Sequence, residues 1–558
     1  MRSHTRDGRG HWGLGLAVCL LTVSVGWGCR GGRSDTAGAT AETAAKKKKR
    51  RGDVLATLVE MAQPKKLFIE TRPETVVSLL NDWVAMGGES FEATEELDEV
   101  YKRLLDASFC ERVQAPRFAR RDASHIRDAL WYAAISRVIC EGADGDLARA
   151  NRLFGYATRN IVLRSDDDTL LPLAPFAVAM FGEGNVRDRA WLFANLLRQL
   201  RIDAVVFHPP VEGGDVLVGV LLDNHVYLYD PLLGVPVPSG PASEGDAAIK
   251  RPATLAAVRA NPDLLENLAA GDEGYRFTSQ SLAKPVVSIV GATSFWAPRM
   301  RRLQLALSSN HDVLLWDPLE SSDVVPEGAM ARLATAGFDA ESVTIWAYPE
   351  SRMDGNADLS TQQLKLFQMR SRAFESPVPV SQVLANDQTG QVQLKEAERG
   401  NFRHRMSRNR QLLGEWQTSV TTYLKIRMWR DVPPLPKSIG FIDRGDQAGL
   451  RSLLSTRVRL IHDEAADDAA FWTAICQYEQ GAVESAANAM QEYLDRSGPH
   501  EWESGAVWLQ GLWRGELKQW SQAVAILETI KASDPHHPGA RLLLSRFKPL
   551  VASEAKIP

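Results

Sequence analysis

Apolar residues recur every three or four positions over residues 54–165, the spacing that places them on one face of an α-helix. Segments such as "RPETVVSLLNDWVAM" and "ASHIRDALWYAAISRVIC" carry this pattern. The stretch "FGEGNVRDRAWLFANLLRQL" (residues 181–200) carries it too, with an apolar stripe from Ala190 to Leu197. We therefore expect a helical lead-in followed by a buried helix whose first residue is Val186.

The pattern changes to strands after this helix. "DAVVF" (residues 203–207) reads as a buried strand, and "DVLVGVLLDNHVYLYDP" (residues 215–231) reads as two strands around the turn pair Asp223-Asn224. A turn there pairs Leu222 with His225. Because side chains alternate between the two faces of a sheet, residues 215, 217, 219 and 221 then share one face with residues 226, 228, 230 and 232.

Residues 285–350 alternate strand-like and helical segments. "VVSIV", "DVLLW" and "VTIWAY" are predicted strands, "RMRRLQLAL" is a helix that Pro298 can open, and "AMARLATAG" is a further helix. This order predicts a second, smaller α/β unit. Residues 355–400 are polar and lack a clear period, so we expect a connector there.

The chain from about residue 402 is helical with a tandem character. The segments "GEWQTSVTTYL", "GAVESAANAMQEYL" and "KQWSQAVAILETI" each pair a short turn with a helix that carries small residues. Aligning Ser419, Ala486 and Ala523 gives spacings of 67 and 37 residues, close to two units and one unit of a helical hairpin of about 34 residues. Residues 402–550 thus resemble tetratricopeptide repeats, with an unrelated helical bundle as the alternative.

The N-terminus has the features of a targeting segment. Arg2, Arg6 and Arg9 precede the apolar run "WGLGLAVCLLTVSVGWG", and Cys29 follows it. This arrangement resembles a bacterial lipoprotein signal, which implies a lipid on Cys29 and attachment to a membrane; a plain secretory signal or an uncleaved anchor is the alternative. The basic run Lys46 to Arg51 is either a solvated spacer or a segment held against anionic lipid headgroups.

Composition narrows the classes of function. The chain has 558 residues and a net charge of −4, which predicts several domains and gives no general attraction to nucleic acid. Beyond Cys29 it holds Cys110, Cys140 and Cys476, too few and too scattered for a disulfide framework, although a Cys110–Cys140 bridge stays open. No CxxC or HExxH spacing is present, so we expect neither a metal nor another cofactor.

The region 122–235 resembles the transglutaminase-like family, whose members share a papain-like α+β fold. That family has a Gly-x-Cys-x-Asp helix start, a helix ending in a leucine- and arginine-rich segment, and a hairpin ending in Asp-Pro. Here the corresponding residues are Gly184-x-Val186-x-Asp188, "LLRQLRIDAVVF" and Asp230-Pro231. Asn185 can cap the helix start, with Asp188 completing a capping box.

The resemblance implies a triad of cysteine, histidine and aspartate at Val186, Asp215 and Asp230, of which only the aspartate is retained. Valine cannot attack a carbonyl, and thiol catalysis needs a thiolate and a base within hydrogen-bond reach. His225 is expected to be exposed beside the turn, and His208 is the other histidine nearby. Asp215 and Asp230 share a face of the predicted hairpin. We expect them to be two solvated acids; the alternative is that they serve acid–base chemistry or bind a cation.

The sequence thus predicts a multidomain protein with an α+β transglutaminase-like (papain-like) domain, a small α/β unit and an all-α tetratricopeptide-like region. The expected order is a signal (residues 1–29), a linker (30–53), the helical lead-in and transglutaminase-like domain (54–280), the small unit and connector (281–400) and the repeats (401–558). We expect a non-catalytic, membrane-anchored scaffold of the bacterial cell envelope that binds a protein or peptide through its repeats. An active hydrolase or acyl transferase using unrecognised residues, and a scaffold that works through residues 285–350, are the alternatives.

Overall fold

The computed structural model describes residues 36–67, 71–87, 99–164, 171–211, 213–243, 245–247, 249–268, 274–308, 311–374, 381–385, 392–396, 402–428, 456–496 and 500–554. It divides into two compact units, Met1–Gly52 and Asp53–Pro558. In the first unit the described residues belong to the beginning of helix α1 (Thr36–Ala62). The predicted linker over residues 30–53 is helical from Thr36 onward, because the alanine, glutamate and lysine residues of this stretch are strong helix formers.

Helices form the first part of the second unit, as the spacing of apolar residues predicted. They are α2 (Pro73–Gly87), α3 (Glu99–Leu104), α4 (Ala107–Gln114), α5 (Arg120–Ile139) and α6 (Gly145–Asn160). Leu58 and Val59 of α1 are buried in a cluster with Trp83 of α2 and with Met300, which lies far along the chain. Helix α2 packs against α5. The lead-in is thus part of the folded core of the unit.

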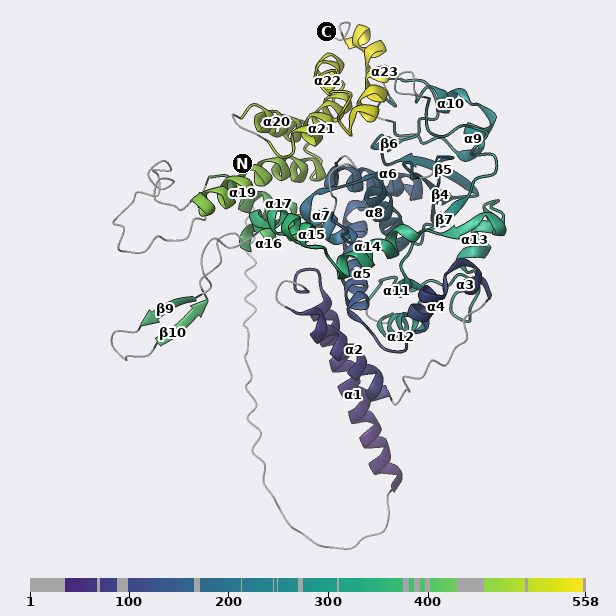
Figure 1. Cartoon of the computed structure of the whole chain (residues 1–558), viewed down its shortest axis with the longest axis vertical. Coiled ribbons are helices and arrows are strands. Elements are labelled where there is room, and N and C mark those ends of the chain that lie inside the picture. The colour runs from purple at the N-terminus through teal and green to yellow at the C-terminus, as the bar shows by residue number, and fades with distance from the viewer. Residues whose placement is uncertain are drawn as a thin grey trace, which may run out of the picture. The chain divides into compact units, whose positions relative to one another are not determined.

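The centre of the unit is a six-stranded sheet in the order β6-β5-β4-β3-β7-β8 (Figure 1). Strands β7 and β8 run parallel, and every other neighbouring pair is antiparallel. Leu222 pairs with His225 across the β4–β5 turn, and Asp223 and Asn224 have φ values of 49° and 63°, so the predicted hairpin and its register are confirmed. The strands are β3 (Ala204–Phe207), β4 (Leu217–Leu222), β5 (His225–Asp230), β6 (Val235–Pro236), β7 (Val287–Ile289) and β8 (Val343–Ile345).

Both faces of the sheet are covered. Helices α5, α6 and α8 (Val186–Gln199) pack on one face, where Val206 and Val218 are buried with Phe193. Val205 and Phe207 point to the opposite face and pack in a cluster with residues of α9 (Leu255–Ala260) and α13 (Ala329–Thr335). Burial on both sides explains why "AVVF" is apolar throughout rather than alternating.

The predicted second α/β unit is not separate, because β7 pairs directly with β3, with Val205 opposite Ile289. The predicted strand "DVLLW" (residues 312–316) forms neither a strand nor a helix. A small pair, β1 (Val162–Leu163) and β2 (Glu183–Gly184), flanks α7 (Pro175–Phe181). The remaining elements of this part are α10 (Asp263–Glu266), α11 (Thr293–Trp296), α12 (Pro298–Leu307), α14 (Ala347–Ala357), α15 (Thr361–Arg370), the 3₁₀ turns at Ala340–Ser342 and Arg372–Phe374, and the hairpin of β9 (Ser381–Ala385) and β10 (Val392–Glu396).

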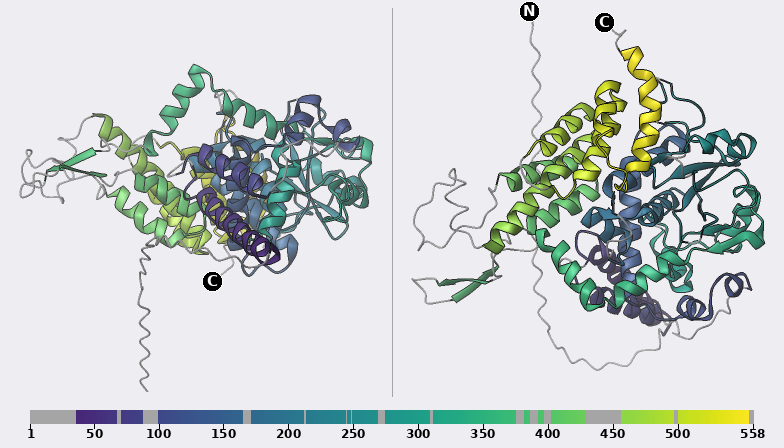
Figure 2. Two further views of the ribbon diagram at one scale, coloured as in Figure 1. Left: turned by 90° about the horizontal axis from the view of Figure 1, so that it is seen from below. Right: turned by 45° about the horizontal axis from the view of Figure 1, so that its top comes forward.

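The C-terminal part consists of helical hairpins. Consecutive helices pack against each other in chain order, and Figure 2 shows them stacked along one side of the sheet-containing part. The turns of three hairpins hold a residue with positive φ at the same place: Gly414 (81°), Gly481 (81°) and Lys518 (60°). This repeated geometry confirms the alignment of the three segments. The helices are α16 (Phe402–Leu412), α17 (Trp416–Arg427), α19 (Thr456–Glu479), α20 (Val483–Leu494), α21 (Glu503–Glu516), α22 (Trp520–Leu527) and α23 (His537–Glu554).

Candidate functional site

Helix α8 begins as the sequence predicted. The Asn185 side chain accepts a hydrogen bond from the backbone N–H of Asp188 at 2.9 Å, and the Asp188 carboxylate accepts one from the Asn185 backbone N–H at 3.0 Å. Val186 is the first helical residue and is only 6% exposed. The position that the transglutaminase resemblance assigns to a nucleophile thus holds a buried hydrocarbon.

The Asp188 carboxylate ties α8 to α14. The Tyr348 hydroxyl donates to it at 2.8 Å, and the Arg352 guanidinium donates to it at 3.1 Å. Asp188 is fully buried, and burial raises its pKa although Arg352 acts in the opposite direction. Its hydrogen bonds make this carboxylate a structural group rather than one that faces a substrate.

Asp230 is also a structural group. It is 0% exposed, so the expectation of a solvated acid is wrong. Its carboxylate accepts hydrogen bonds from Tyr275 (2.6 Å), from Arg276 (2.7 Å) and from the backbone N–H groups of Leu232 (2.9 Å) and Leu233 (3.1 Å). The backbone bonds fix the turn after β5, and the two side-chain bonds attach the segment around residue 275 to the sheet.

Arg276 also contacts Asp215, through the backbone of that residue. The Arg276 guanidinium donates to the Asp215 backbone carbonyl at 2.8 Å. The charges of Asp230 and, more weakly, Asp215 both act to raise the pKa of Arg276, against the opposing effect of burial. Arg276 thus connects the Asp230 carboxylate to the backbone at Asp215. Sequence reasoning missed Tyr275 and Arg276 because no spacing rule connects them to a hairpin that ends at Asp230.

The two histidines near the hairpin differ in environment. His225 is exposed at the turn, as predicted. His208 follows β3, and its Nε2 lies 2.7 Å from the Ser288 hydroxyl of β7, which in turn lies 2.7 Å from the Thr344 hydroxyl of β8. Burial and, secondarily, Arg187 lower the pKa of His208. The signal that could have identified Ser288 is a single hydroxyl residue within the otherwise apolar strand "VVSIV".

This hydrogen-bonded chain lies in an open cleft of about 930 Å³ at one end of the sheet. The residues that line it and matter below are Arg187, His208, Lys284, Ser288, Thr344 and Trp346, with Tyr348 and the rim residues Val211 and Val286. We call it the α8 cleft, because Arg187 is the second residue of that helix. Val186 itself is not part of the lining.

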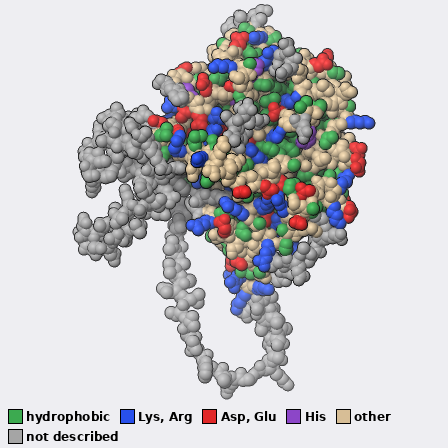
Figure 3. Space-filling model, viewed as in Figure 1, with side chains coloured by type: hydrophobic (Ala, Val, Ile, Leu, Met, Phe, Trp, Pro, Cys, Tyr) green, Lys and Arg blue, Asp and Glu red, His purple; other side chains and the backbone are tan. Residues whose placement is uncertain are grey.

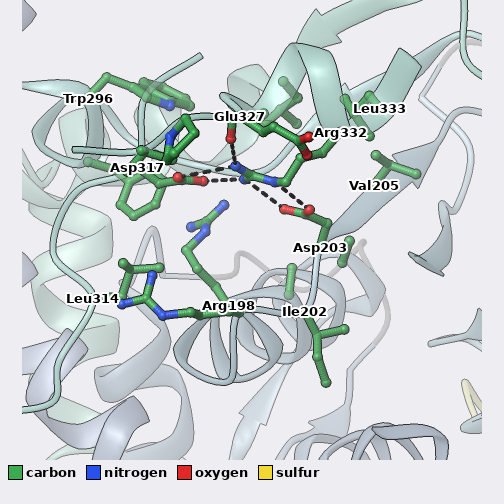
Figure 4. Close-up of a pocket in the computed structure, with 18 residues that line it drawn as sticks. Arg198, Ile202, Asp203, Val205, Trp296, Leu314, Asp317, Glu327, Arg332 and Leu333 are labelled. Carbon is green, nitrogen blue, oxygen red and sulfur yellow. Dashed lines mark hydrogen bonds and ion pairs between the residues drawn. The ribbon is translucent and has the colours of Figure 1, made fainter. Parts of the chain in front are cut away.

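A second cavity of about 410 Å³ lies between the end of α8 and α13. Figure 4 shows that Arg332 points between Asp203 and Asp317. Its guanidinium donates to Asp203 at 2.6 and 3.0 Å and to Asp317 at 2.5 Å. Because the acids are paired within the wall, this cavity offers a ligand little uncompensated charge.

The cysteines do not supply a reactive thiol at either cavity. Cys110, Cys140 and Cys476 are all free in the structure, so the possible Cys110–Cys140 bridge is absent. Burial raises the pKa of each thiol, in the case of Cys140 to about 11. Each is therefore protonated at neutral pH, and the thiolate is the nucleophilic form.

The first helices of the hairpins pack on the sheet-containing part. Arg159 of α6 pairs with Glu479 of α19 at 2.9 Å. His536, just before α23, accepts a hydrogen bond from the backbone N–H of Leu163 at 3.3 Å and contacts Arg189 of α8 at 3.4 Å. The inner side of the helical array is thus covered by the chain itself, which leaves α17, α20 and α22 as the outward helices.

The comparisons with known proteins agree with the repeat geometry. A sequence model of the tetratricopeptide repeat matches residues 468–497. This segment covers the second half of α19 and all of α20. Tetratricopeptide repeats mediate protein–protein contacts, so the match indicates a protein-interaction region. Searches of curated proteins and of solved structures found no match.

The membrane expectations fall partly outside the described residues. Cys29 lies outside them, and the basic run Lys46 to Arg51 lies within α1. Among the helices that the structure describes, none is long and apolar enough to span a bilayer. The described residues also hold no cluster of three or more potential metal ligands. Figure 3 shows basic and acidic side chains interspersed over the face in view.

Proposed function

We propose that this protein is a membrane-anchored, non-catalytic scaffold of the bacterial cell envelope, in which a transglutaminase-like domain and tetratricopeptide repeats together form a platform for a protein partner. The observation that carries this proposal is the match of residues 468–497 to the repeat family. The lipid on Cys29 and the attraction of the basic run in α1 to anionic lipids are parts of the proposal that rest on the sequence alone.

The state of the former triad positions supports the absence of catalysis. Val186 is buried and carries no nucleophilic atom, and all four hydrogen bonds to Asp230 come from groups that hold the fold. A carboxylate that orients a catalytic histidine must accept a hydrogen bond from that histidine. Asp230 instead faces Arg276, and substituting cysteine at Val186 alone would therefore not rebuild a working triad.

The covered inner face of the repeats determines where a partner can bind. The inner helices are occupied by α6, α8 and the β5–β6 turn, so we place the partner on the outward helices α20 and α22. Ser485 on α20 and Ala525 on α22 are both exposed there. Binding on this side requires no separation of the repeats from the sheet.

The test is photocrosslinking in intact cells with a benzophenone amino acid at Ser485 or Ala525. Asp263, an exposed residue of α10 on the sheet-containing part, is the matched control position. We expect the same discrete adduct from both repeat positions and none from the control. Equal adducts at all three positions, or incorporation of an amine into a glutamine-containing protein by the purified chain, would overturn the proposal.

A second candidate function is a serine-dependent hydrolase or acyl transferase, favoured by the 2.7 Å contact between His208 and Ser288. In that case His208 would take the proton of the Ser288 hydroxyl during attack on a carbonyl. Two features make it second: Ser288 is 2% exposed, and no carboxylate among the described residues is hydrogen-bonded to His208. A fluorophosphonate probe distinguishes the two functions, because it labels an activated serine covalently. If the protein is a non-catalytic scaffold, the probe should label neither the native chain nor Ser288→Ala.

A further inference from the structure

The α8 cleft has a one-sided charge. Arg187 and Lys284 line it, and none of the described residues in its lining is an aspartate or glutamate. The acid closest along α8, Asp188, is buried and bonded to Tyr348 and Arg352. Arg187 donates a hydrogen bond to the Gly213 carbonyl, and no carboxylate among the described lining residues pairs with either cation, unlike Arg332 in the second cavity.

The neutral surfaces of the cleft suit an extended peptide. The Thr344 hydroxyl and the His208 imidazole can exchange hydrogen bonds with a peptide backbone, while the buried Ser288 hydroxyl joins the two from below. Trp346 and Tyr348 stack with ring centroids 5.1 Å apart and form an aromatic wall. Burial keeps the pKa of His208 low, so at neutral pH the positive charge comes from Arg187 and Lys284.

The rim adds apolar surface. Val211 and Val286 are 74% and 52% exposed, and both lie on the cleft. Exposed branched aliphatic residues beside cations favour a ligand in which acidic and apolar side chains alternate. Alternation is also what an extended chain presents, because successive side chains point in opposite directions.

We propose that the α8 cleft binds an extended acidic peptide segment of a partner protein, whose carboxylates pair with Arg187 and Lys284 and whose apolar side chains cover Val211 and Val286. This inference rests on the proposed scaffold function and assigns the chemistry of a second contact, separate from α20 and α22. The volume of about 930 Å³ accommodates a segment of several residues.

The experiment measures fluorescence anisotropy of the full chain with a labelled peptide of alternating leucine with glutamate or aspartate. The same peptide with glutamine and asparagine in place of the acids is the matched ligand. We expect the acidic peptide to bind about tenfold more tightly at low salt, and the difference to shrink at 1 M salt, where charges are screened beyond about 3 Å. Equal binding of the two peptides would refute the proposal.

The protein variants locate the site. Lys284→Gln should weaken binding of the acidic peptide about fivefold, the upper end for an exposed ion pair, and Lys531→Gln, at an exposed lysine of the repeat region, should leave it unchanged. The inference would also be overturned if Lys284→Gln bound the acidic peptide as tightly as the native chain does. The same holds if a single-stranded oligonucleotide bound as tightly as the acidic peptide and its binding depended on Lys284. Failure here with crosslinking retained at Ser485 removes only this inference, whereas probe labelling of Ser288 removes the proposed function.

Discussion

The substitution Asp230→Asn tests most directly whether this aspartate stabilises the fold or serves a reaction. Asparagine keeps the shape of the side chain and one carbonyl oxygen, so the bonds from the Leu232 and Leu233 backbones can persist. What is lost is the negative charge opposite Arg276, whose side chain is 17% exposed, together with the oxygen that accepts the Tyr275 hydrogen bond. The perturbation is therefore mainly electrostatic.

The expected cost follows from this geometry. Removing one partner of a buried ion pair typically costs about 3–5 kcal/mol, because the other charge remains buried without compensation. Asp215 stays close enough to Arg276 to act on its pKa, which favours the lower end. We expect a loss of about 3 kcal/mol in the free energy of unfolding. In a double-mutant cycle with Arg276→Met, the double variant should lose less than the sum of the two single variants.

The assay is urea unfolding followed by tryptophan fluorescence, with Asp263→Asn as the control. Asp263 is exposed on α10, and its substitution should change the free energy of unfolding by less than about 0.5 kcal/mol. An Asp230→Asn variant as stable as the native chain would refute the structural role. Loss of a measurable acyl-transfer or hydrolytic reaction with unchanged unfolding would refute it as well.

Three further outcomes are expected. Acidification from pH 6.5 to pH 4 should lower the free energy of unfolding by about 3 kcal/mol through His536, because burial lowers the pKa of this histidine from 6.5 to about 4 and the unfolded chain therefore takes up the proton first. The melting temperature of His536→Asn should fall less over this range than that of the native chain. An equal fall of the melting temperature in both proteins would contradict this. Iodoacetamide at neutral pH should modify Cys140 and Cys476 much more slowly than free cysteine, as read by intact mass, since burial raises both pKa values. Cys29→Ser should move the protein from the membrane fraction to the soluble fraction of fractionated cells, and unchanged fractionation would refute the lipid anchor.

Local features of the fold could be predicted because each depends on neighbouring residues. The capping box of Asn185 and Asp188 needs only a three-residue spacing, and the turn at Asp223-Asn224 needs only two residues that tolerate positive φ. The register of the hairpin follows from that turn. The tandem turns of the repeats were recognisable for the same reason, since Gly414 and Gly481 permit a left-handed backbone.

Features that depend on distant segments could not be predicted. The pairing of β7 with β3 joins segments about eighty residues apart, so residues 285–350 looked like a unit of their own. The bonds of Tyr275 and Arg276 to Asp230, and the contact of Ser288 with His208, likewise follow from tertiary packing. Sequence patterns identified where charged groups occur but not which of them neutralise each other, which is why Asp230 was expected to be solvated.

Two buried arginines meet at the end of α6, and one of them, Arg408, ties the repeats to the sheet-containing part. Arg189 of α8 donates to the carbonyls of Thr158 and Ile161 at the end of α6, and Arg408 of α16 donates to the carbonyl of Asn160. Among the described residues, neither guanidinium forms an ion pair with a carboxylate. The last carbonyls of a helix lack partners within the helix and carry partial negative charge, so they can accept such donors.

This arrangement has a consequence for partner binding. Because Arg408 of α16 donates to the carbonyls of Asn160 and Ala179, moving the repeats away from the sheet would leave its guanidinium and these carbonyls without hydrogen bonds. Each unsatisfied buried polar group costs about 1–3 kcal/mol. The binding free energy of a partner on the inner face would first have to offset the sum of these costs. A partner is therefore expected to recognise surfaces that are already open, namely the outward helices α20 and α22 and the α8 cleft, rather than the inner face that helical repeats of this kind offer when they stand alone.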